Sequence, residues 1–308
     1  MVRLSFFVQL KYEIVGAPAD FIFNVHATRT QCQALVSEDL QVKPDLPVSL
    51  FTDPAHGNRY ARLRAWPGDL ELRYEATVDI AHYVASPDNI AEVSIADLPP
   101  ETLPYIYPSR YCQSDRLHQL ARDEFGTMTP GYGRVRAIRD WVQQRTKFQS
   151  GSSNPTTSAI DTLSDRAGVC RDFAHLMIAI CRALNIPARF VTGIDYGAAP
   201  ELGPPDFHAY VEVYLGTHWY AFDPTGISPP MGLARIGTGR DAADVAFATL
   251  FGSMKSGAPL ISISARNEPA AGFVLPIHSM DALSTSDEIA LPSQRDPLAL
   301  PSTQGEPS

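Results

Sequence analysis

The sequence contains little cysteine. Its 308 residues include only Cys32, Cys112, Cys170 and Cys181. No two of them have the Cys-x-x-Cys spacing, which argues against a zinc ribbon or a thioredoxin-type site. Cys170 and Cys181 lie about three turns apart on one predicted helix, so they cannot form a disulfide with each other. There is also no EF-hand pattern, and we expect neither a metal nor an organic cofactor.

Long apolar runs and positive charge are also scarce. No segment is long and apolar enough to span a bilayer. Residues 2–11 alternate apolar and polar side chains as a strand does, except at Phe7, and they do not resemble a signal peptide. The formal charge of −9 argues against nucleic acid or an anionic membrane surface as the main partner. We therefore expect a cytoplasmic protein, in whose reducing surroundings a free thiol can persist.

The pattern of apolar residues divides the chain into three parts. Strand-like alternation, clearest over 70–80, predicts a β-rich, sandwich-like domain at 1–95 with one solvated face. Helical spacing then appears among strands, and we predict a second, catalytic domain at 96–280. Ser, Pro, Thr and Asp dominate after residue 280, so we expect a disordered tail at 281–308.

One cysteine stands at the predicted start of a helix. The spacing of the apolar residues that follow puts Cys170 on the buried stripe of this helix, within its first turn. A helix N-terminus favours a thiolate, and a free backbone N–H there can bind a developing oxyanion. Cys181 lies mid-helix among apolar neighbours and is predicted to be a core residue. A lone Cys170 would also be read as a core residue, but its position and the partners described next favour a nucleophile.

Residues 208–223 predict a β-hairpin with a two-residue turn at 216–217. This turn pairs Tyr210 with Asp223, so His208 and Asp223 project from the same face as diagonal neighbours, with Cα atoms roughly 7–8 Å apart. A carboxylate in that place can hold an imidazole in one tautomer and stabilise its protonated form. We therefore predict His208 as the base and Asp223 as the residue that orients it.

His175 competes with His208 as the base because it is close to Cys170 in the sequence. On a helix, however, a residue five positions further on points roughly 140° away. We expect His175 to pack behind the helix, where Asp172 can pair with it. A metal site formed by Cys170 and His175 fails for the same reason, and it lacks further ligands at a recognisable spacing.

Three short motifs resemble those of the bacterial transglutaminase-like superfamily: GVCRDFAH at 168–175, HAYVEV at 208–213 and FDPT at 222–225. Residues 100–255 are similar to the papain-like core of that family. The first 90 or so residues are similar to the N-terminal domain that commonly precedes the core. The segment GTGRDAADV at 237–245 is similar to the family segment that follows the catalytic aspartate.

The resemblance implies an α+β fold in which the cysteine helix packs on an antiparallel sheet, preceded by the β-rich domain. It implies Cys170 as nucleophile, His208 as base and Asp223 as the orienting residue. It leaves the second oxyanion donor open among the side chains that follow Phe148, which are Gln149, Ser150, Ser152, Ser153 and Asn154.

The expected function is acyl transfer through a thioester on a peptide or protein substrate. Hydrolysis, by a cysteine protease or amidase, is favoured for a cytoplasmic chain. A transglutaminase, which passes a glutamine acyl group to an amine, uses the same triad and stays an alternative. A non-catalytic binding or assembly module is a second alternative, against which the three intact polar residues argue.

Overall fold

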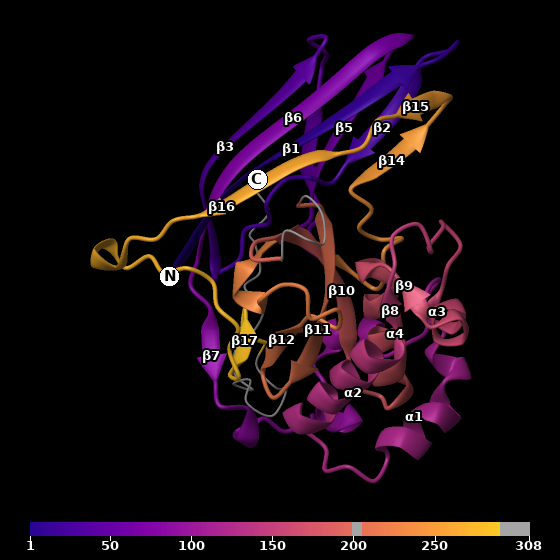
Figure 1. Ribbon diagram of the computed structural model, residues 1–308, viewed down its shortest axis with the longest axis vertical. Coiled ribbons are helices and arrows are strands. Elements are labelled where there is room, and N and C mark those ends of the chain that lie inside the picture. The colour runs from indigo at the N-terminus through magenta and orange to yellow at the C-terminus, as the bar shows by residue number, and fades with distance from the viewer. Residues whose placement is uncertain (199–204, 290–308) are drawn as a thin grey trace, which may run out of the picture.

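The computed structural model describes residues 1–198 and 205–289. Figure 1 shows a strand-rich part above a part in which helices cover one face of a small sheet. This is the α+β arrangement predicted from the sequence. Within the described ranges, no helix is long and apolar enough to cross a membrane.

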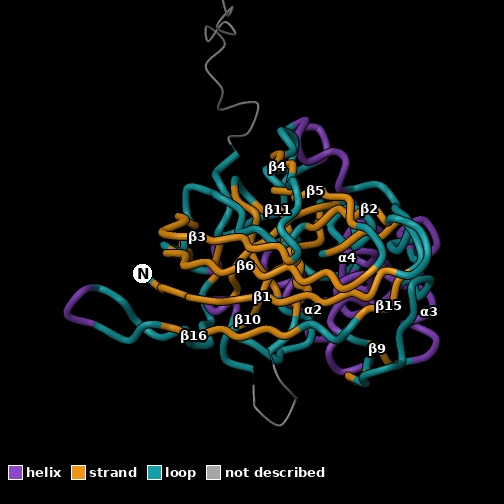
Figure 2. Tube along the Cα trace, turned by 90° about the horizontal axis from the view of Figure 1, so that it is seen from above, coloured by secondary structure: helices purple, strands orange, loops and turns teal. Residues whose placement is uncertain are grey.

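The upper part is built from two antiparallel sheets. The first has the order β15-β1-β6-β3, with β16 also pairing β1, and Figure 2 shows its long strands side by side. The second has the order β14-β2-β5-β4. The strands of the first sheet are β1 (Val2–Ile14), β3 (Gln33–Lys43), β6 (Gly68–Ile80), β15 (Met254–Ser256) and β16 (Leu260–Ala265). Those of the second are β2 (Ala19–Phe23), β4 (Ser49–Thr52), β5 (Arg59–Ala65) and β14 (Ala248–Phe251).

Alternation along these strands creates the core between the two sheets. In β1 every second residue from Val2 to Ile14 is buried, and its partner β6 shows the same alternation. Aromatic rings join the sheets, and the Tyr12 and Phe21 rings have centroids 5.3 Å apart. This confirms the sandwich with one apolar face per strand that the period-2 pattern predicts.

The upper sheets include strands from late in the chain. Strands β14, β15 and β16, which lie within the predicted second domain at 96–280, pair with β2 and β1 of the upper sheets. Short strands of this kind carry no sequence signal for a partner that lies more than two hundred residues away. The domain boundaries at residues 95 and 280 stay a prediction. The upper sheets, however, contain strands from before residue 95 and strands from after it.

The lower part is a four-stranded antiparallel sheet, β12-β11-β10-β13, with helices packed on one face. The sheet consists of β10 (Ala188–Asp195), β11 (Phe207–Leu215), β12 (His218–Phe222) and β13 (Leu233–Gly239). The helices are α1 (His118–Phe125), α2 (Tyr132–Arg145), α3 (Ala159–Asp165) and α4 (Cys170–Ala183). Helix α4 contacts the sheet and the other three helices, so it forms the centre of this part.

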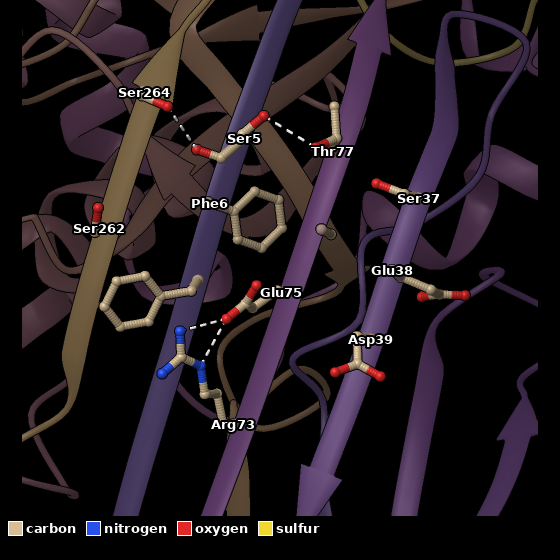
Figure 3. A pocket seen from close by; sticks show the side chains of 12 residues that line it. Ser5, Phe6, Ser37, Glu38, Asp39, Arg73, Glu75, Thr77, Ser262 and Ser264 are labelled. Carbon is tan, nitrogen blue, oxygen red and sulfur yellow. Dashed lines mark hydrogen bonds and ion pairs between the residues drawn. The ribbon is translucent and has the colours of Figure 1, made fainter.

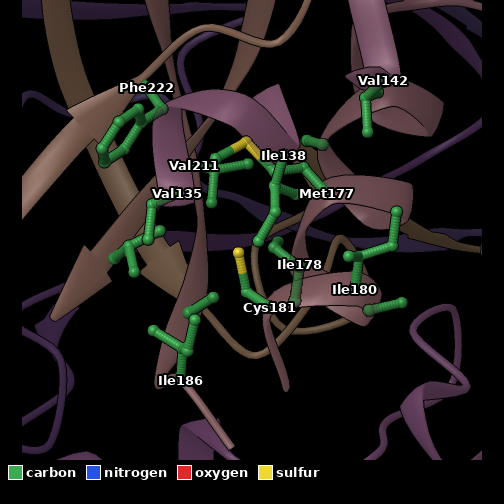
Figure 4. Close-up of a cluster of buried hydrophobic side chains, with 14 of the residues drawn as sticks. Val135, Ile138, Val142, Met177, Ile178, Ile180, Cys181, Ile186, Val211 and Phe222 are labelled. Atoms are coloured by element: carbon green, nitrogen blue, oxygen red, sulfur yellow. The ribbon is translucent and has the colours of Figure 1, made fainter. Parts of the chain in front are cut away.

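Figure 4 shows the apolar cluster around α4. Met177 and Cys181 of α4 lie among side chains of α2 and of the sheet, including Val211 and Phe222. Every α4 residue from Asp172 onward is buried. The core role predicted for Cys181 is confirmed, because this residue is fully buried in the cluster. The helix ends at Ala183, and Asn185 then adopts a left-handed φ of 61°.

Smaller elements complete the fold. Two-residue strands β8 (Lys147–Phe148) and β9 (Ala167–Gly168) pair in parallel just before α4. Strand β7 (Tyr83–Ala85) pairs with β17 (Ala282–Ser284). Short 3₁₀ helices occur at Pro87–Asn89, Ile95–Asp97, Pro100–Tyr105, Ser114–Arg116, Pro230–Gly232 and Pro269–Ala271.

The predicted disordered tail at 281–308 is wrong for its first part. Residues 282–284 form β17, and Ser286 is buried. The Ser286 hydroxyl donates to the Glu212 carboxylate and accepts a hydrogen bond from Arg235. A composition rule treats serine and threonine as solvated, but here they satisfy a buried ion pair. Residues 290–308 lie outside the described residues.

Candidate active site

Cys170 is the first residue of α4, as predicted. The preceding residue, Val169, is extended, and its backbone N–H donates to the Asp172 carboxylate at 2.9 Å. The thiol is half-buried, and its Sγ lies 3.9 Å from the Phe207 carbonyl oxygen at the start of β11. Helix α4 therefore presents its N-terminal thiol to the beginning of the strand that carries His208.

The hairpin register is confirmed. β11 and β12 pair Leu215 with His218 and Val211 with Phe222 across a two-residue turn in which Gly216 has φ of 58°. The structure brings His208 and Asp223 together, with Nε2 of His208 3.3 Å from Oδ2 of Asp223. The pair is close but not aligned as a hydrogen bond. Such contacts are often loose before a substrate binds.

A turn after β12 fixes the Asp223 carboxylate. Oδ1 accepts hydrogen bonds from the Thr225 backbone N–H at 2.9 Å and from the Thr225 hydroxyl at 2.7 Å. Oδ2, which faces His208, also accepts from the Ser228 N–H at 3.2 Å. The Ser228 hydroxyl in turn donates to the buried Asp195 at the end of β10. The carboxylate is therefore held in one orientation by backbone and side-chain donors.

Electrostatics favour a charged His208–Asp223 pair. Burial opposes the imidazolium, but the Asp223 carboxylate and the neighbouring Cys170 outweigh burial and raise the pKa of His208 well above 6.5. Burial also opposes the carboxylate, but His208 and Thr225 outweigh it and lower the pKa of Asp223 below 3.8. Both shifts favour the ionised form of the pair, an imidazolium beside a carboxylate.

His175 packs at the back of α4, as predicted. Its ring stacks on Tyr111 with centroids 4.9 Å apart, and its Nε2 accepts a hydrogen bond from the Ala242 N–H at 3.2 Å. Burial and the nearby arginines hold the pKa of His175 well below 6.5. The predicted pairing of His175 with Asp172 is wrong, because the Asp172 carboxylate instead accepts hydrogen bonds at the start of α4.

The loop after β8 holds the candidates for a second oxyanion donor. The Gln149 backbone N–H donates to the Gly168 carbonyl at 2.9 Å, so it is already engaged. The Ser152 hydroxyl donates to the Gln149 carbonyl at 2.7 Å, and the Ser153 hydroxyl donates to Asp172 at 2.9 Å. The amino-acid sequence does not distinguish these groups, because nothing in the composition of the loop shows which hydroxyl forms a hydrogen bond to the start of α4.

The remaining candidates differ in their partners. The Asn154 side-chain oxygen accepts hydrogen bonds from the backbone and hydroxyl of Thr156. Gln149 and Ser150 are exposed. Within residues 1–198 and 205–289, their side chains form no hydrogen bond. These two side chains are therefore open to a substrate.

Two hollows in the surface of the described residues lie away from Cys170. One of about 390 Å³ lies on the outer face of the upper sheet, between β16, β1, β6 and β3, and is lined by Ser5, Arg73 and Glu75 among others (Figure 3). A second, of about 350 Å³, lies beside Tyr111 and the start of α3. Neither is lined by Cys170, so the geometry around the thiol identifies the site and hollow size does not. No group of three or more His, Cys, Asp or Glu residues in the described part of the chain is arranged to hold a metal.

Comparisons with known proteins identify the family of this chain and agree with its fold. Residues 118–224 match the family model of the transglutaminase-like superfamily, and residues 3–101 match that of the bacterial transglutaminase N-terminal domain. The crystal structure of a Cytophaga hutchinsonii protein described as a "putative cysteine protease" is 41% identical, with a TM-score of 0.84. The likeness covers 92% of this chain and 97% of that one.

Curated relatives are more distant. An uncharacterized protein of Mycobacterium leprae is 30% identical over 117 residues, which is 36% of this chain and 42% of that protein. An uncharacterized protein of Mycobacterium tuberculosis is 29% identical over 143 residues, which is 43% of this chain and 46% of that protein. The matches thus span less than half the length of these relatives. The family models and the structural neighbour together cover both parts of the fold, and the chain belongs to the transglutaminase-like superfamily, with a bacterial transglutaminase N-terminal domain.

Proposed function

We propose that this chain is a cysteine acyl-transfer enzyme in which Cys170, His208 and Asp223 form the catalytic triad. Family membership and the likeness to the Cytophaga hutchinsonii protein support a cysteine-based enzyme. The observation that carries the triad is the 3.3 Å contact between His208 and Asp223, beside a thiol at a helix N-terminus. Hydrolysis of a peptide or amide bond is the reaction that we propose first, because the Cytophaga hutchinsonii protein is described as a "putative cysteine protease".

The steps follow from this geometry. The Cys170 thiolate attacks the carbonyl carbon, and the oxyanion that develops accepts hydrogen bonds from free N–H groups in the first turn of α4. His208 gives its proton to the departing amine, the C–N bond breaks, and a thioester remains. A water then loses a proton to His208, attacks the thioester and releases the acid and the Cys170 thiolate.

Asp223 supports both halves of this cycle. Because it faces Nε2 of His208, the other ring nitrogen, Nδ1, is left for the thiol and for the leaving group. The carboxylate holds the ring in this orientation and stabilises the imidazolium that exists before attack. The three donors on Asp223 keep it from turning away.

An amine acceptor is the second candidate reaction. Asp206 directly precedes Phe207, whose carbonyl oxygen lies 3.9 Å from the Cys170 Sγ. A carboxylate there would attract a protonated amine, such as a lysine side chain, which would attack the thioester after it has lost a proton. The chemistry of the triad is the same for both acceptors.

Mass spectrometry of products from a glutamine-peptide library, with and without a primary amine, tests the proposal. Hydrolysis predicts cleavage or a deamidated peptide in both reactions, with no amine adduct. Amine incorporation would replace the hydrolytic proposal with the transglutaminase one. No product in either reaction, together with an unreactive Cys170, would favour a non-catalytic binding module.

A further inference from the structure

The loop at 149–157 is fastened to the first turn of the nucleophile helix. Its first residue continues strand β8, and the Gln149 N–H donates to the Gly168 carbonyl, two residues before Cys170. Its middle contacts residues on the other side of the thiol, Arg171 and Asp172. Loop contacts therefore bracket the nucleophile in the sequence on both sides.

Asp172 is the fixed point of this attachment. Its side chain is fully buried, and its two oxygens have different tasks. Oδ2 accepts from the Val169 N–H at 2.9 Å and so fixes the start of the helix. Oδ1 accepts from the Ser153 hydroxyl at 2.9 Å. A Cβ on Gly168 would lie 2.7 Å from the Asp172 Cβ, so the glycine of the motif leaves the room this carboxylate needs.

Arg171 adds a second attachment. Its guanidinium donates to the Ser153 hydroxyl and, at 2.7 Å, to the Asn154 carbonyl. It also lies 5.8 Å from the centre of the Tyr111 ring, and the Tyr111 hydroxyl donates to the Pro155 carbonyl at 2.8 Å. Ser153 stands where both attachments meet, since its oxygen donates to Asp172 and accepts from Arg171.

We propose that Ser153 is a positioning residue. Through its bond to Asp172 it holds the loop at 149–157 against the start of α4, so that hydrogen-bond donors of the loop can stabilise the oxygen of the acyl group. The proposal rests on the acyl-transfer function proposed above. The Ser153 hydroxyl is not itself assigned as an oxyanion donor, because its proton is already donated to Asp172. It acts by keeping the exposed side chains and N–H groups of the loop at a fixed distance from Cys170.

Two reactions of the same thiol separate this role from a general structural one. Acylation by p-nitrophenyl acetate passes through an oxyanion, which needs donors in place, and it releases a burst of p-nitrophenol. Alkylation by iodoacetamide displaces iodide at a saturated carbon and forms no oxyanion. A displaced loop should therefore slow acylation and leave alkylation unchanged.

The test compares Ser153→Ala with wild type in both reactions, with Ser153→Thr to restore the hydroxyl. Ser164→Ala is the matched control, because Ser164 is exposed and donates within its own helix to Ile160. We expect Ser153→Ala to slow the acylation burst about tenfold, less than the ~10²–10³ typical of losing an oxyanion donor outright. Loss of the bond to the buried Asp172 should lower the melting temperature by about 2–4 °C. The alkylation rate of the folded protein should stay at its wild-type value, and Ser153→Thr should recover most of the burst rate and of the melting temperature.

Each other outcome overturns the proposal. An unchanged burst in Ser153→Ala means that the loop does not support the acyl oxygen. A parallel loss of acylation and alkylation, or a lowered melting temperature without rescue by Ser153→Thr, means a general structural role. Absence of any burst in the wild-type chain, with normal alkylation, would contradict the acyl-transfer function itself and the positioning role with it.

Discussion

Nε2 of His208 lies 3.3 Å from Oδ2 of Asp223, across the open end of the β11–β12 hairpin. Both side chains are buried, so water solvates neither charge well. Buried charges of this kind persist when they are paired and further hydrogen-bonded. The pair therefore links the hairpin register, which the turn fixes, to the protonation state of the imidazole.

Asp223→Asn should lower the pKa of His208. The carboxylate is the larger of the influences that oppose burial, and the amide cannot replace its charge. NMR titration of the His208 ring should show a pKa above 6.5 in the wild type and a lower one in the variant. Asp206→Asn is the control, since Asp206 interacts with His208 without pairing to it. Equal pKa values in the wild type and Asp223→Asn would contradict the pairing.

Alkylation should select Cys170 among the four thiols. Burial raises the pKa of Cys32, raises that of Cys112 to about 12, and also raises that of Cys181. At pH 6.5, iodoacetamide followed by peptide mapping should therefore find the label at Cys170. His208→Ala should slow this labelling several-fold, because the imidazolium that stabilises the thiolate is lost. Labelling of Cys32 at a similar rate would count against an activated Cys170.

A buried ion pair on strand β11 should contribute more to the free energy of unfolding than a surface pair. Glu212 is fully buried and contacts Arg189 and Arg235, the latter only 2% exposed. Glu212→Gln leaves Arg235 without its carboxylate and should cost about 3–5 kcal/mol of unfolding free energy. Glu268→Gln, at an exposed pair with Arg266, should change little. Urea unfolding measures the free energy of unfolding of both variants. Similar small decreases in the two variants would show that the Glu212 ion pair does not stabilise the fold.

His175 predicts a loss of stability in mild acid. Its folded pKa is held well below the ordinary 6.5, so the unfolded chain takes up the proton first as pH falls. The stability it contributes is thus present above pH 6.5 and is lost below it, at roughly 1.4 kcal/mol per pH unit. His175→Gln keeps an acceptor for the Ala242 N–H and removes the titration.

Urea unfolding of the wild type and His175→Gln between pH 7 and 5 tests this prediction. The slope of unfolding free energy against pH should be shallower in the variant by up to about 1.4 kcal/mol per pH unit, the contribution of one titrating group. The alkylation rate of Cys170 should be unchanged, because His175 faces away from the thiol. A variant with the wild-type slope would show that His175 is not a buried neutral group.

The local parts of the site could be predicted from the sequence. A two-residue turn fixes the parity of the hairpin, and parity puts His208 and Asp223 on one face. The helical spacing after Cys170 fixes its place in the first turn and turns His175 to the back. Both inferences depend on residues near one another in the chain, where geometry leaves few choices.

Long-range partners could not be predicted in the same way. Nothing local shows that Asp172 bonds Ser153 in place of His175, because both are within reach of a carboxylate at a helix start. Nor does composition show that Ser286 satisfies a buried ion pair, or that strands β14 to β16 return to the upper sheets. Polar residues and short strands acquire such roles only from distant segments.

The most direct test of the triad is to trap the acyl-enzyme. Wild-type protein mixed with p-nitrophenyl acetate and quenched in acid should carry one acetyl group, which peptide mapping places on Cys170. Cys170→Ala should carry none, and His208→Ala should acylate much more slowly while remaining folded. An acetyl group on Cys32, or one that persists in Cys170→Ala, would contradict Cys170 as the nucleophile.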